Sequence, residues 1–363
     1  MGEIASQAVP LLSIVMPVKD GAQYIGQAID SLLKQTFTDF ELIVIDDGSQ
    51  DATAQIVKAY SDPRITLYSQ DNQGVSKASN RGFALARGQY ITRHDHDDIS
   101  LPARLETQVA FLKAHPECGL VGTWAQIWVG DTPTNRVHQH PCSAGEIAFA
   151  LLFNAPFVNT SCIFTRAVLE WTGGYAEGSD RMPPEDYEFF SRVVQRFAMA
   201  NLDQCLVIYR EIPHSQSSAI RSHEERKHSV FVSHLATFSA ENIAWVNALS
   251  LASADALNFG CLVHNYPAGL QLPIRLDKMM HLLSNAAKKI SARFPAHSIA
   301  QSLKERQRFL RYQYHTYLGN TYHWARLQYL LLNRPAYENW GSVSRLVHRL
   351  VRRTLGLNPL SHD

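Results

Sequence analysis

The most chemically suggestive stretch of the chain is Thr92–Asp98, which holds three carboxylates within four residues, those of Asp95, Asp97 and Asp98. It directly follows an apolar run that is typical of a buried strand. Carboxylates at this spacing suit a divalent cation that prefers hard oxygen ligands, and such a cation commonly neutralises phosphate oxygens of a substrate. The alternative is a solvated acidic turn in which Asp98 or Ser100 caps the helix that follows. The stretch alone leaves both interpretations open.

Two histidines interrupt the acidic stretch and would suit a softer metal. In an extended segment, however, successive side chains point to opposite sides. His96 is therefore expected to point away from Asp95 and Asp97. We interpret His94 and His96 as structural residues.

A sheet is needed to position such a cluster, and the first hundred residues alternate between strand and helix patterns. Short apolar runs typical of buried parallel strands are expected at 11–18, 40–45, 64–68 and 88–92. Apolar residues recur at spacings of three and four over residues 24–33, and helices are also expected from about residue 51 and from residue 74 to 86. This alternation predicts an α/β fold with a parallel sheet and right-handed crossovers.

Ligands of such sheets bind beyond the carboxyl ends of the strands. Here those ends carry Lys19-Asp20, Asp46-Asp47 and the acidic stretch, so we expect three loops to share one crevice. Farther along the chain the pattern is less regular. It predicts a helix at 102–115, a strand near 120–124 and a helix from about residue 187.

Length, charge and cysteine content limit the possible domain organisation and class of the protein. Its 363 residues exceed the usual size of one core, so two units are expected. A formal net charge of +1 argues against a nucleic-acid binder. Five scattered cysteines without a Cys-x-x-Cys pair favour a reducing, cytoplasmic setting. Residues 1–10 lack a positive leader and an apolar core, so they are expected to be a short tail, and no transmembrane helix is expected.

Residues 216–363 are predicted to form a helical region, because long stretches rich in Leu, Ala and Tyr are broken by prolines. Its last segment, 342–355, places apolar residues on one side and Arg and His on the other. Such a basic amphipathic helix can lie on the inner face of an anionic membrane as a peripheral contact. The more common alternative is that its apolar face docks on the helical region itself.

Several motifs occur together in a specific order. They are Val15-Met-Pro-Val18, Asp46-Asp-Gly-Ser-Gln-Asp51, Asn72-Gln-Gly74 with Asn80, Ala86-Arg-Gly-Gln-Tyr-Ile91, Asp95-His-Asp-Asp98, Pro102-Ala-Arg-Leu-Glu106 and Pro184-Glu-Asp-Tyr-Glu188. Together they closely resemble the family 2 glycosyltransferases of GT-A fold, a Rossmann-like mixed sheet flanked by helices. The resemblance covers about residues 11–215, with 11–98 as the nucleotide-binding half and 99–215 as the acceptor-binding half.

This resemblance implies a metal-dependent inverting transfer of a sugar from a nucleoside-diphosphate sugar, expected to be a UDP-sugar. The acceptor would be a hydroxyl of a glycan or glycolipid in cell-surface polysaccharide biosynthesis. Asp97 matches the metal ligand of the family's Asp-x-Asp element, with Mn²⁺ or Mg²⁺ expected to stabilise the departing diphosphate. Asp186 matches the catalytic base that takes the proton of the acceptor hydroxyl. The alternative for Asp186 and Glu185 is simply to open a helix at its positive dipole end.

The resemblance also implies a set of binding residues. Asp47 matches the carboxylate that accepts a hydrogen bond from the pyrimidine ring, with helix capping as its alternative. Ser79 and Asn159 depart from the family pattern, since many relatives have Arg and His there, and Lys77 is expected to supply the missing charge. The expected substrate-binding residues are Pro17, Val18, Asp20, Asp47, Lys77, Asn80, Asp95, Glu185 and Arg210, and His214 is a second candidate metal ligand.

Two other classes of function fit parts of this pattern. A sugar-phosphate nucleotidyltransferase also joins a nucleotide-binding α/β domain with acidic metal ligands, but its glycine-rich basic loop is missing after the first strand. A non-catalytic sugar-nucleotide-binding module is the other alternative. The presence of both Asp97 and Asp186 favours an enzyme.

Overall fold

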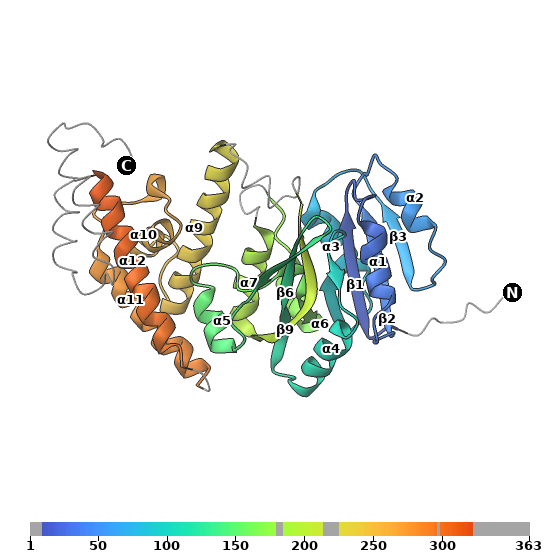
Figure 1. Ribbon diagram of the computed structural model, residues 1–363. Coiled ribbons are helices and arrows are strands. Elements are labelled where there is room, and N and C mark those ends of the chain that lie inside the picture. Colours follow the sequence, from blue (N-terminus) through green and yellow to red (C-terminus); the bar gives the residue numbers. More distant parts are fainter. Residues whose placement is uncertain (1–8, 179–183, 213–224, 296–297, 322–363) are drawn as a thin grey trace, which may run out of the picture.

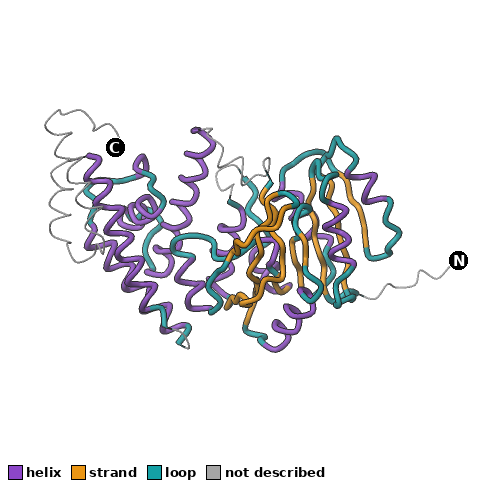
Figure 2. Tube along the Cα trace, in the orientation of Figure 1, coloured by secondary structure: helices purple, strands orange, loops and turns teal. Residues whose placement is uncertain are grey.

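The computed structural model describes residues 9–178, 184–212, 225–295 and 298–321. It shows a mixed sheet flanked by helices, with further helices packed at one end (Figure 1, Figure 2). The strands follow the order β3-β2-β1-β4-β8-β6-β9-β5, and β7 pairs with β6. Their bounds are β1 Leu12–Val18, β2 Phe40–Asp46, β3 Ile65–Ser69, β4 Tyr90–Arg93, β5 Ile99–Ser100, β6 Cys118–Val129, β7 Thr132–His138, β8 Ile163–Thr165 and β9 Ala198–Glu211. The expected α/β fold class is confirmed.

The parallel half of the sheet matches the sequence pattern closely. β1 pairs in parallel with β2 and β4, and β2 pairs in parallel with β3. Leu12 stands opposite both Phe40 and Tyr90, while Val18 stands opposite Asp46. The carboxyl ends of these strands therefore share one edge, where the predicted loops begin.

Alternation along β1 divides the core between the two faces of the sheet. Ile14 and Met16 pack with the apolar side of α1, whereas Val15 belongs to the cluster on the opposite face with Phe83 of α3. This is the period of two that a strand imposes on its side chains. The helices that cover these faces are α1 Ile25–Leu33, α2 Thr53–Lys58, α3 Val75–Leu85 and α4 Arg104–Ala114.

The other half of the sheet differs more from the prediction. β8 pairs antiparallel with both β4 and β6, and β6 then pairs in parallel with β9. β6 has 12 residues and extends well past the predicted strand at 120–124. Its register shifts around Thr123 and Trp124, and this irregularity interrupts the alternation from which a strand is recognised. The helices of this half are α5 Ala144–Ala150, α6 Arg166–Thr172 and α7 Glu185–Arg196, with a 3-10 turn at Asn159–Ser161.

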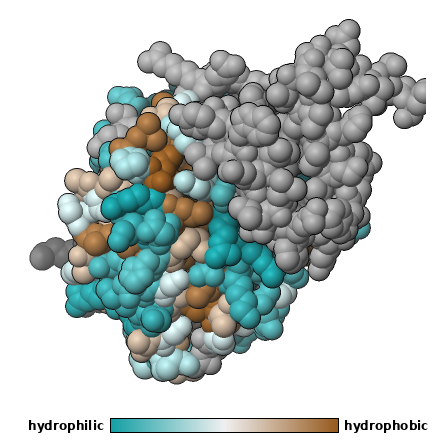
Figure 3. Space-filling view, turned by 90° about the vertical axis from the view of Figure 1, so that its left-hand side faces the viewer, coloured by the Kyte–Doolittle hydropathy of each residue, from teal (hydrophilic) through white to brown (hydrophobic). Residues whose placement is uncertain are grey.

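Helices follow the sheet in the described part of residues 216–363, as the sequence predicts. They are α9 Glu225–Asn247, α10 Ala254–Val263, α11 Leu276–Arg293 and α12 Ala300–Thr321. α9 contacts α7, and α11 contacts α5, so these helices pack directly on the sheet-bearing part. Viewed from this end, the described surface mixes apolar and hydrophilic side chains (Figure 3). Among the described residues, no helix combines the length and apolar character that crossing a membrane requires.

Candidate active site

The loops after β1 and β2 are joined by backbone and side-chain hydrogen bonds. Asp20 donates its backbone N–H to Ser49 Oγ at 2.9 Å, and its Oδ1 accepts from the Gln50 N–H at 2.7 Å. Ala22 donates its N–H to Asp51 Oδ2 at 2.9 Å. Asp20 adopts φ of +52°, a left-handed conformation that Asp tolerates and that bends the chain after β1. The structure thus brings two of the predicted loops together.

Asp47 orders the start of α3. Its side chain is 4% exposed, and its two oxygens accept hydrogen bonds from Gln70 Nε2 at 2.7 Å, Gln73 N at 2.9 Å and Gly74 N at 2.8 Å. A carboxylate offers about four acceptor positions, so about one remains for a base. The predicted neighbours Pro17 and Val18 are buried within β1. The base-binding role of these residues stays a prediction.

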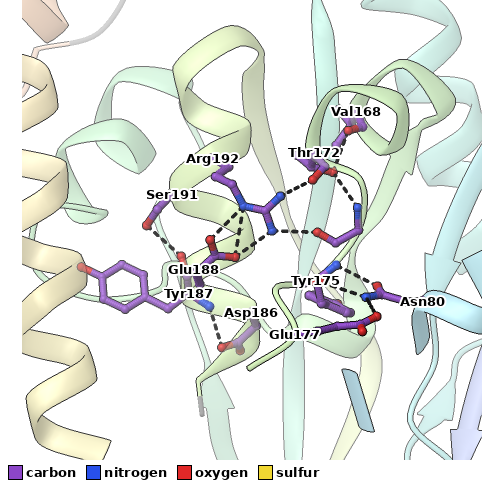
Figure 4. Close-up of polar contacts among 11 residues, drawn as sticks. Asn80, Val168, Thr172, Tyr175, Glu177, Asp186, Tyr187, Glu188, Ser191 and Arg192 are labelled. Atoms are coloured by element: carbon purple, nitrogen blue, oxygen red, sulfur yellow. Dashed lines mark hydrogen bonds and ion pairs between the residues drawn. The ribbon is translucent and has the colours of Figure 1, made fainter. Parts of the chain in front are cut away.

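On α3, the two predicted donor-site residues differ in environment. Lys77 is exposed and available to a ligand. Asn80 instead holds the loop before α7: its Nδ2 donates to the Tyr175 carbonyl at 2.9 Å and to Glu177 Oε1 at 2.7 Å, while its Oδ1 accepts from Tyr175 N (Figure 4). We therefore interpret Asn80 as a residue that shapes the site wall. Asn159 accepts a hydrogen bond from the Tyr175 hydroxyl at 3.0 Å.

Arg93 connects the acidic stretch with the helix that carries the predicted base. Its guanidinium contacts Asp95 Oδ1 at 2.7 Å and Glu185 Oε1 at 2.9 Å, and its side chain is only 8% exposed. Burial alone would lower the pKa of Arg93, but Asp95, Tyr175 and Glu185 raise it well above its ordinary value. Sequence reasoning assigned no role to Arg93. The sequence feature that could have indicated a role for Arg93 is its position at the end of β4, directly before the three carboxylates.

Arg210 of β9 is only 1% exposed and forms hydrogen bonds with Asp97 and Asp98. Its Nη1 donates to the Asp97 carbonyl at 2.7 Å, and its backbone N–H donates to Asp98 Oδ1 at 2.9 Å. The guanidinium also contacts Gly130 and Gln27. We interpret Arg210 as a residue that fixes the acidic loop, in place of the predicted direct contact with substrate.

The helix-capping alternative for Asp98 and Ser100 is wrong. α4 begins after Ala103 without a side-chain cap, and Asp98 bonds to β9. Ser100 lies in β5, where its Oγ contacts His94 Nε2 at 2.9 Å. His94 is fully buried, and burial lowers its pKa to about 3, so its ring is neutral. His94 is therefore a structural residue, as the sequence predicts.

The residues of the acidic loop fit a divalent cation. Burial, followed by the carboxylates of Asp97 and Asp95, raises the pKa of Asp98 well above its usual range, and burial also raises the pKa of Asp97. Asp98 Oδ2 is buried without a hydrogen-bond partner among the described residues. A nearby cation would offset this crowding of negative charge.

Within the described ranges, no set of three or more His, Cys, Asp or Glu side chains converges as a complete metal site. The predicted ligand His214 lies outside the described residues.

Asp186 lies in the first turn of α7, and its Oδ1 accepts the N–H of Tyr187 at 2.7 Å (Figure 4). The pKa of Asp186 is raised to about 7, mainly by burial and then by the neighbouring Glu185, while the Tyr187 N–H and Arg93 act in the opposite direction. A general base is most effective when its pKa lies near the working pH. The positive charge of Arg93 acts to lower the pKa of both Asp186 and Asp97, against the stronger effect of burial.

A cavity of about 130 Å³ lies elsewhere, between α5, α7, α9 and α11. Its lining is mostly apolar and includes Leu152, Val194 and Ile290. Val194 follows Asp186 by eight residues on α7, which is roughly 12 Å along the helix axis. This cavity is therefore separate from the carboxylates of the candidate active site.

Several known proteins are similar to this chain. A family model described as "Glycosyl transferase family 2" matches residues 13–173. An uncharacterized glycosyltransferase of Haemophilus influenzae is 31% identical over 229 residues, which are 60% of this chain and 70% of that protein. The O-antigen biosynthesis glycosyltransferase WbnJ of Escherichia coli is 29% identical over 227 residues, 61% of this chain and 87% of that protein. Two Rickettsia glycosyltransferases are matched over 32% of their lengths.

Among solved structures, residues 1–349 of TarS from S. aureus, in complex with UDP-GlcNAc, are similar to this chain. The TM-score is 0.54 at 20% sequence identity, and the match covers 83% of this chain and 87% of that one. This likeness extends through most of the chain and supports the GT-A type of fold. With the family model and the Haemophilus relative, it leads to one conclusion: the chain belongs to glycosyltransferase family 2.

Proposed function

We propose that the chain is a metal-dependent inverting glycosyltransferase that moves a sugar from a nucleoside-diphosphate sugar to a hydroxyl of a glycan or glycolipid acceptor. The observation that carries the proposal is the bridge made by Arg93, which binds Asp95 of the acidic loop and Glu185 of α7. Asp95 lies two residues before the candidate cation ligand Asp97, and Glu185 directly precedes the candidate base Asp186, so the bridge supports a shared site for the two. A transfer reaction needs both kinds of group in one place.

In the proposed reaction, the acceptor oxygen attacks the anomeric carbon while the bond from that carbon to the diphosphate breaks. Asp186 accepts the proton of the acceptor hydroxyl, and attack from the face opposite the diphosphate inverts the configuration. A cation held by Asp97 would supply positive charge that stabilises the developing negative charge of the leaving diphosphate. Arg210 keeps the backbone of this loop in place, and Asp98 remains a second candidate ligand.

The comparisons support a role in polysaccharide assembly and a UDP-sugar as the first donor to test. The Escherichia coli relative acts in O-antigen biosynthesis, and another relative is the chondroitin synthase of Pasteurella multocida. The similar TarS structure holds UDP-GlcNAc. We keep Asp47, Pro17, Val18 and Lys77 as the proposed donor-binding residues.

The division of the chain at residue 215 also stays a prediction. The basic segment 342–355 lies outside the described residues. We therefore still predict, without a test, that this segment contacts the inner face of the membrane. The cytoplasmic placement of the protein stays a prediction for the same reason.

The experiment is a panel of UDP-sugars incubated with the full chain and Mn²⁺, with release of UDP as the readout. We expect the parent to turn over one donor in the presence of Mn²⁺. UDP release should be abolished in Asp97→Ala, and it should be abolished in the parent when a chelator removes the metal. The product formed with an identified acceptor should have the anomeric configuration opposite to that of the donor, as read by NMR coupling constants. Retained configuration, or full activity of Asp97→Ala, would refute the proposal.

A further inference from the structure

The first turn of α7 is anchored to the following helices through Tyr187, the residue after the proposed base. Its side chain is fully buried, and its hydroxyl donates to the Leu151 carbonyl at 2.8 Å. The same hydroxyl lies 3.0 Å from Ser239 Oγ of α9, which in turn lies 2.8 Å from His264 Nε2 at the end of α10. The ring packs edge-on against Phe238 of α9, with ring centroids 5.7 Å apart.

The direction of this hydrogen-bond chain follows from counting protons. Each hydroxyl has one proton, and that of Tyr187 is donated to Leu151. Ser239 must then donate to the Tyr187 oxygen, so Nε2 of His264 carries the proton that Ser239 accepts. Burial lowers the pKa of His264 to about 4, which agrees with a neutral ring that donates from Nε2. Every hydroxyl in the chain has a partner, as a stable buried network requires.

The backbone of Tyr187 is fixed by the same helices. Its carbonyl accepts from Ser191 Oγ at 2.8 Å, and that hydroxyl accepts from Asn242 Nδ2 of α9 at 2.9 Å. Its N–H binds Asp186 Oδ1 at 2.7 Å. The first turn of α7 has no side-chain cap of its own. The orientation of the Asp186 carboxylate therefore depends on an anchor supplied from α9 and α10.

We propose that Tyr187 is a positioning residue for Asp186, and that Ser239 and His264 extend this anchor into the helical region. The proposal rests on the function proposed above, since it requires Asp186 to be the base. A base must be held within a fraction of an ångström of its working geometry, and misplacement by about 1 Å can cost on the order of a hundredfold in rate. The helices after the sheet thereby take part in catalysis without touching the substrate.

The test is Tyr187→Phe, with kcat and KM measured for sugar transfer. This variant keeps the buried ring, Leu151 keeps its bond from Asn242 Nδ2 at 2.7 Å, and Ser239 keeps His264, so the fold should persist. We expect kcat to fall about tenfold with an unchanged KM for the donor. The matched control is Tyr60→Phe, which removes a hydroxyl bonded to Gly26 and Asp30 far from α7 and should leave kcat unchanged.

A double mutant separates positioning from a merely structural role. Asp186→Asn should retain a small residual rate; if Tyr187 acts through Asp186, adding Tyr187→Phe should cause no further loss of that residual rate. A multiplied loss in the double mutant, or a kcat of Tyr187→Phe equal to that of Tyr60→Phe, would overturn the inference. If Tyr187→Phe fails to fold, Ser239→Ala is judged by the same two criteria, with an expected loss of about threefold.

Variants of His264 provide a rescue experiment, and Asp186→Asn separates this inference from the proposed function. His264→Phe should lower kcat, whereas His264→Gln, which retains a donor, should restore most of it. Retention of transfer by Asp186→Asn would defeat the proposed function itself. Loss of transfer in Asp186→Asn with an unaffected Tyr187→Phe would defeat only the positioning role.

Discussion

Replacing Asp186 by Asn should stabilise the protein while reducing transfer to a small residual rate. The folded protein holds the pKa of Asp186 at about 7, mainly because the carboxyl is buried, against an ordinary value of 3.8. Between these two pH values the unfolded chain has lost a proton that the folded chain keeps, so the stability of the parent falls as pH rises from about 4 to about 7. The cost is fully present above pH 7 and absent below pH 4.

The size of the effect follows from this difference in pKa. At about 1.4 kcal/mol for each pKa unit, the difference corresponds to about 4 kcal/mol. Asp186 is mostly buried but keeps part of its surface exposed, and screening by solvent there reduces the penalty, so we expect about 2 kcal/mol. For a chain of this size that is a rise in Tm of about 3 °C. Asn retains the oxygen that accepts the Tyr187 N–H, so the local hydrogen bond should persist.

The assay is thermal unfolding of parent and variant from pH 4 to pH 8. The variant should be more stable at pH 8 and equal to the parent at pH 4. The control is Asp62→Asn, because the guanidinium of Arg64 lowers the pKa of Asp62 and this change should reduce stability slightly at pH 8. An Asp186→Asn variant that is no more stable than the parent at pH 8 would show that the carboxyl is not strained in the folded state.

Two further predictions concern packing and charge, and a third concerns pH. Arg93→Gln leaves the buried carboxylate of Glu185 and the partly exposed one of Asp95 without their cation, so urea unfolding should show a loss of about 3 kcal/mol. An unchanged midpoint would contradict the bridge. Gly260→Ala should cost about 2 kcal/mol by the same assay, because a Cβ there would lie 2.0 Å from the Ala236 carbonyl oxygen of α9. The comparison variant is Gly173→Ala, whose Cβ meets no atom within 4 Å, so that any loss of stability there comes from its φ of +70° alone. Transfer should rise with pH through about 7 as Asp186 loses its proton, and a rate that falls over that range would contradict its role as base.

The parallel half of the fold could be predicted from sequence because β1, β2 and β4 are buried on both faces and α1 carries a regular apolar stripe. β1, β2 and β4 begin and end within one or two residues of the predicted bounds. The second half escaped prediction for physical reasons. β5 and β8 have two and three residues, which is too short to show a period, and the irregular register of β6 breaks its alternation.

The candidate site was predictable where chemistry is local and unpredictable where it depends on distant partners. The carboxylates of Asp95 and Asp97 lie within one short stretch, so a shared role could be proposed from the sequence alone. Asn80 binds Tyr175, which lies 95 residues away, and Arg210 holds Asp97 across 113 residues. No local pattern encodes such pairs. The same holds for Arg93, whose partner Glu185 is 92 residues away.

The central claim is that Asp97 and Asp186 perform separate tasks in one site. Calorimetric titration of UDP into the parent chain, Asp97→Asn and Asp186→Asn, each with and without Mn²⁺, tests it most directly. We expect Mn²⁺ to strengthen UDP binding to the parent and to Asp186→Asn, and to have no effect on Asp97→Asn. Equal enhancement by Mn²⁺ in all three proteins would contradict the assignment of the cation to Asp97.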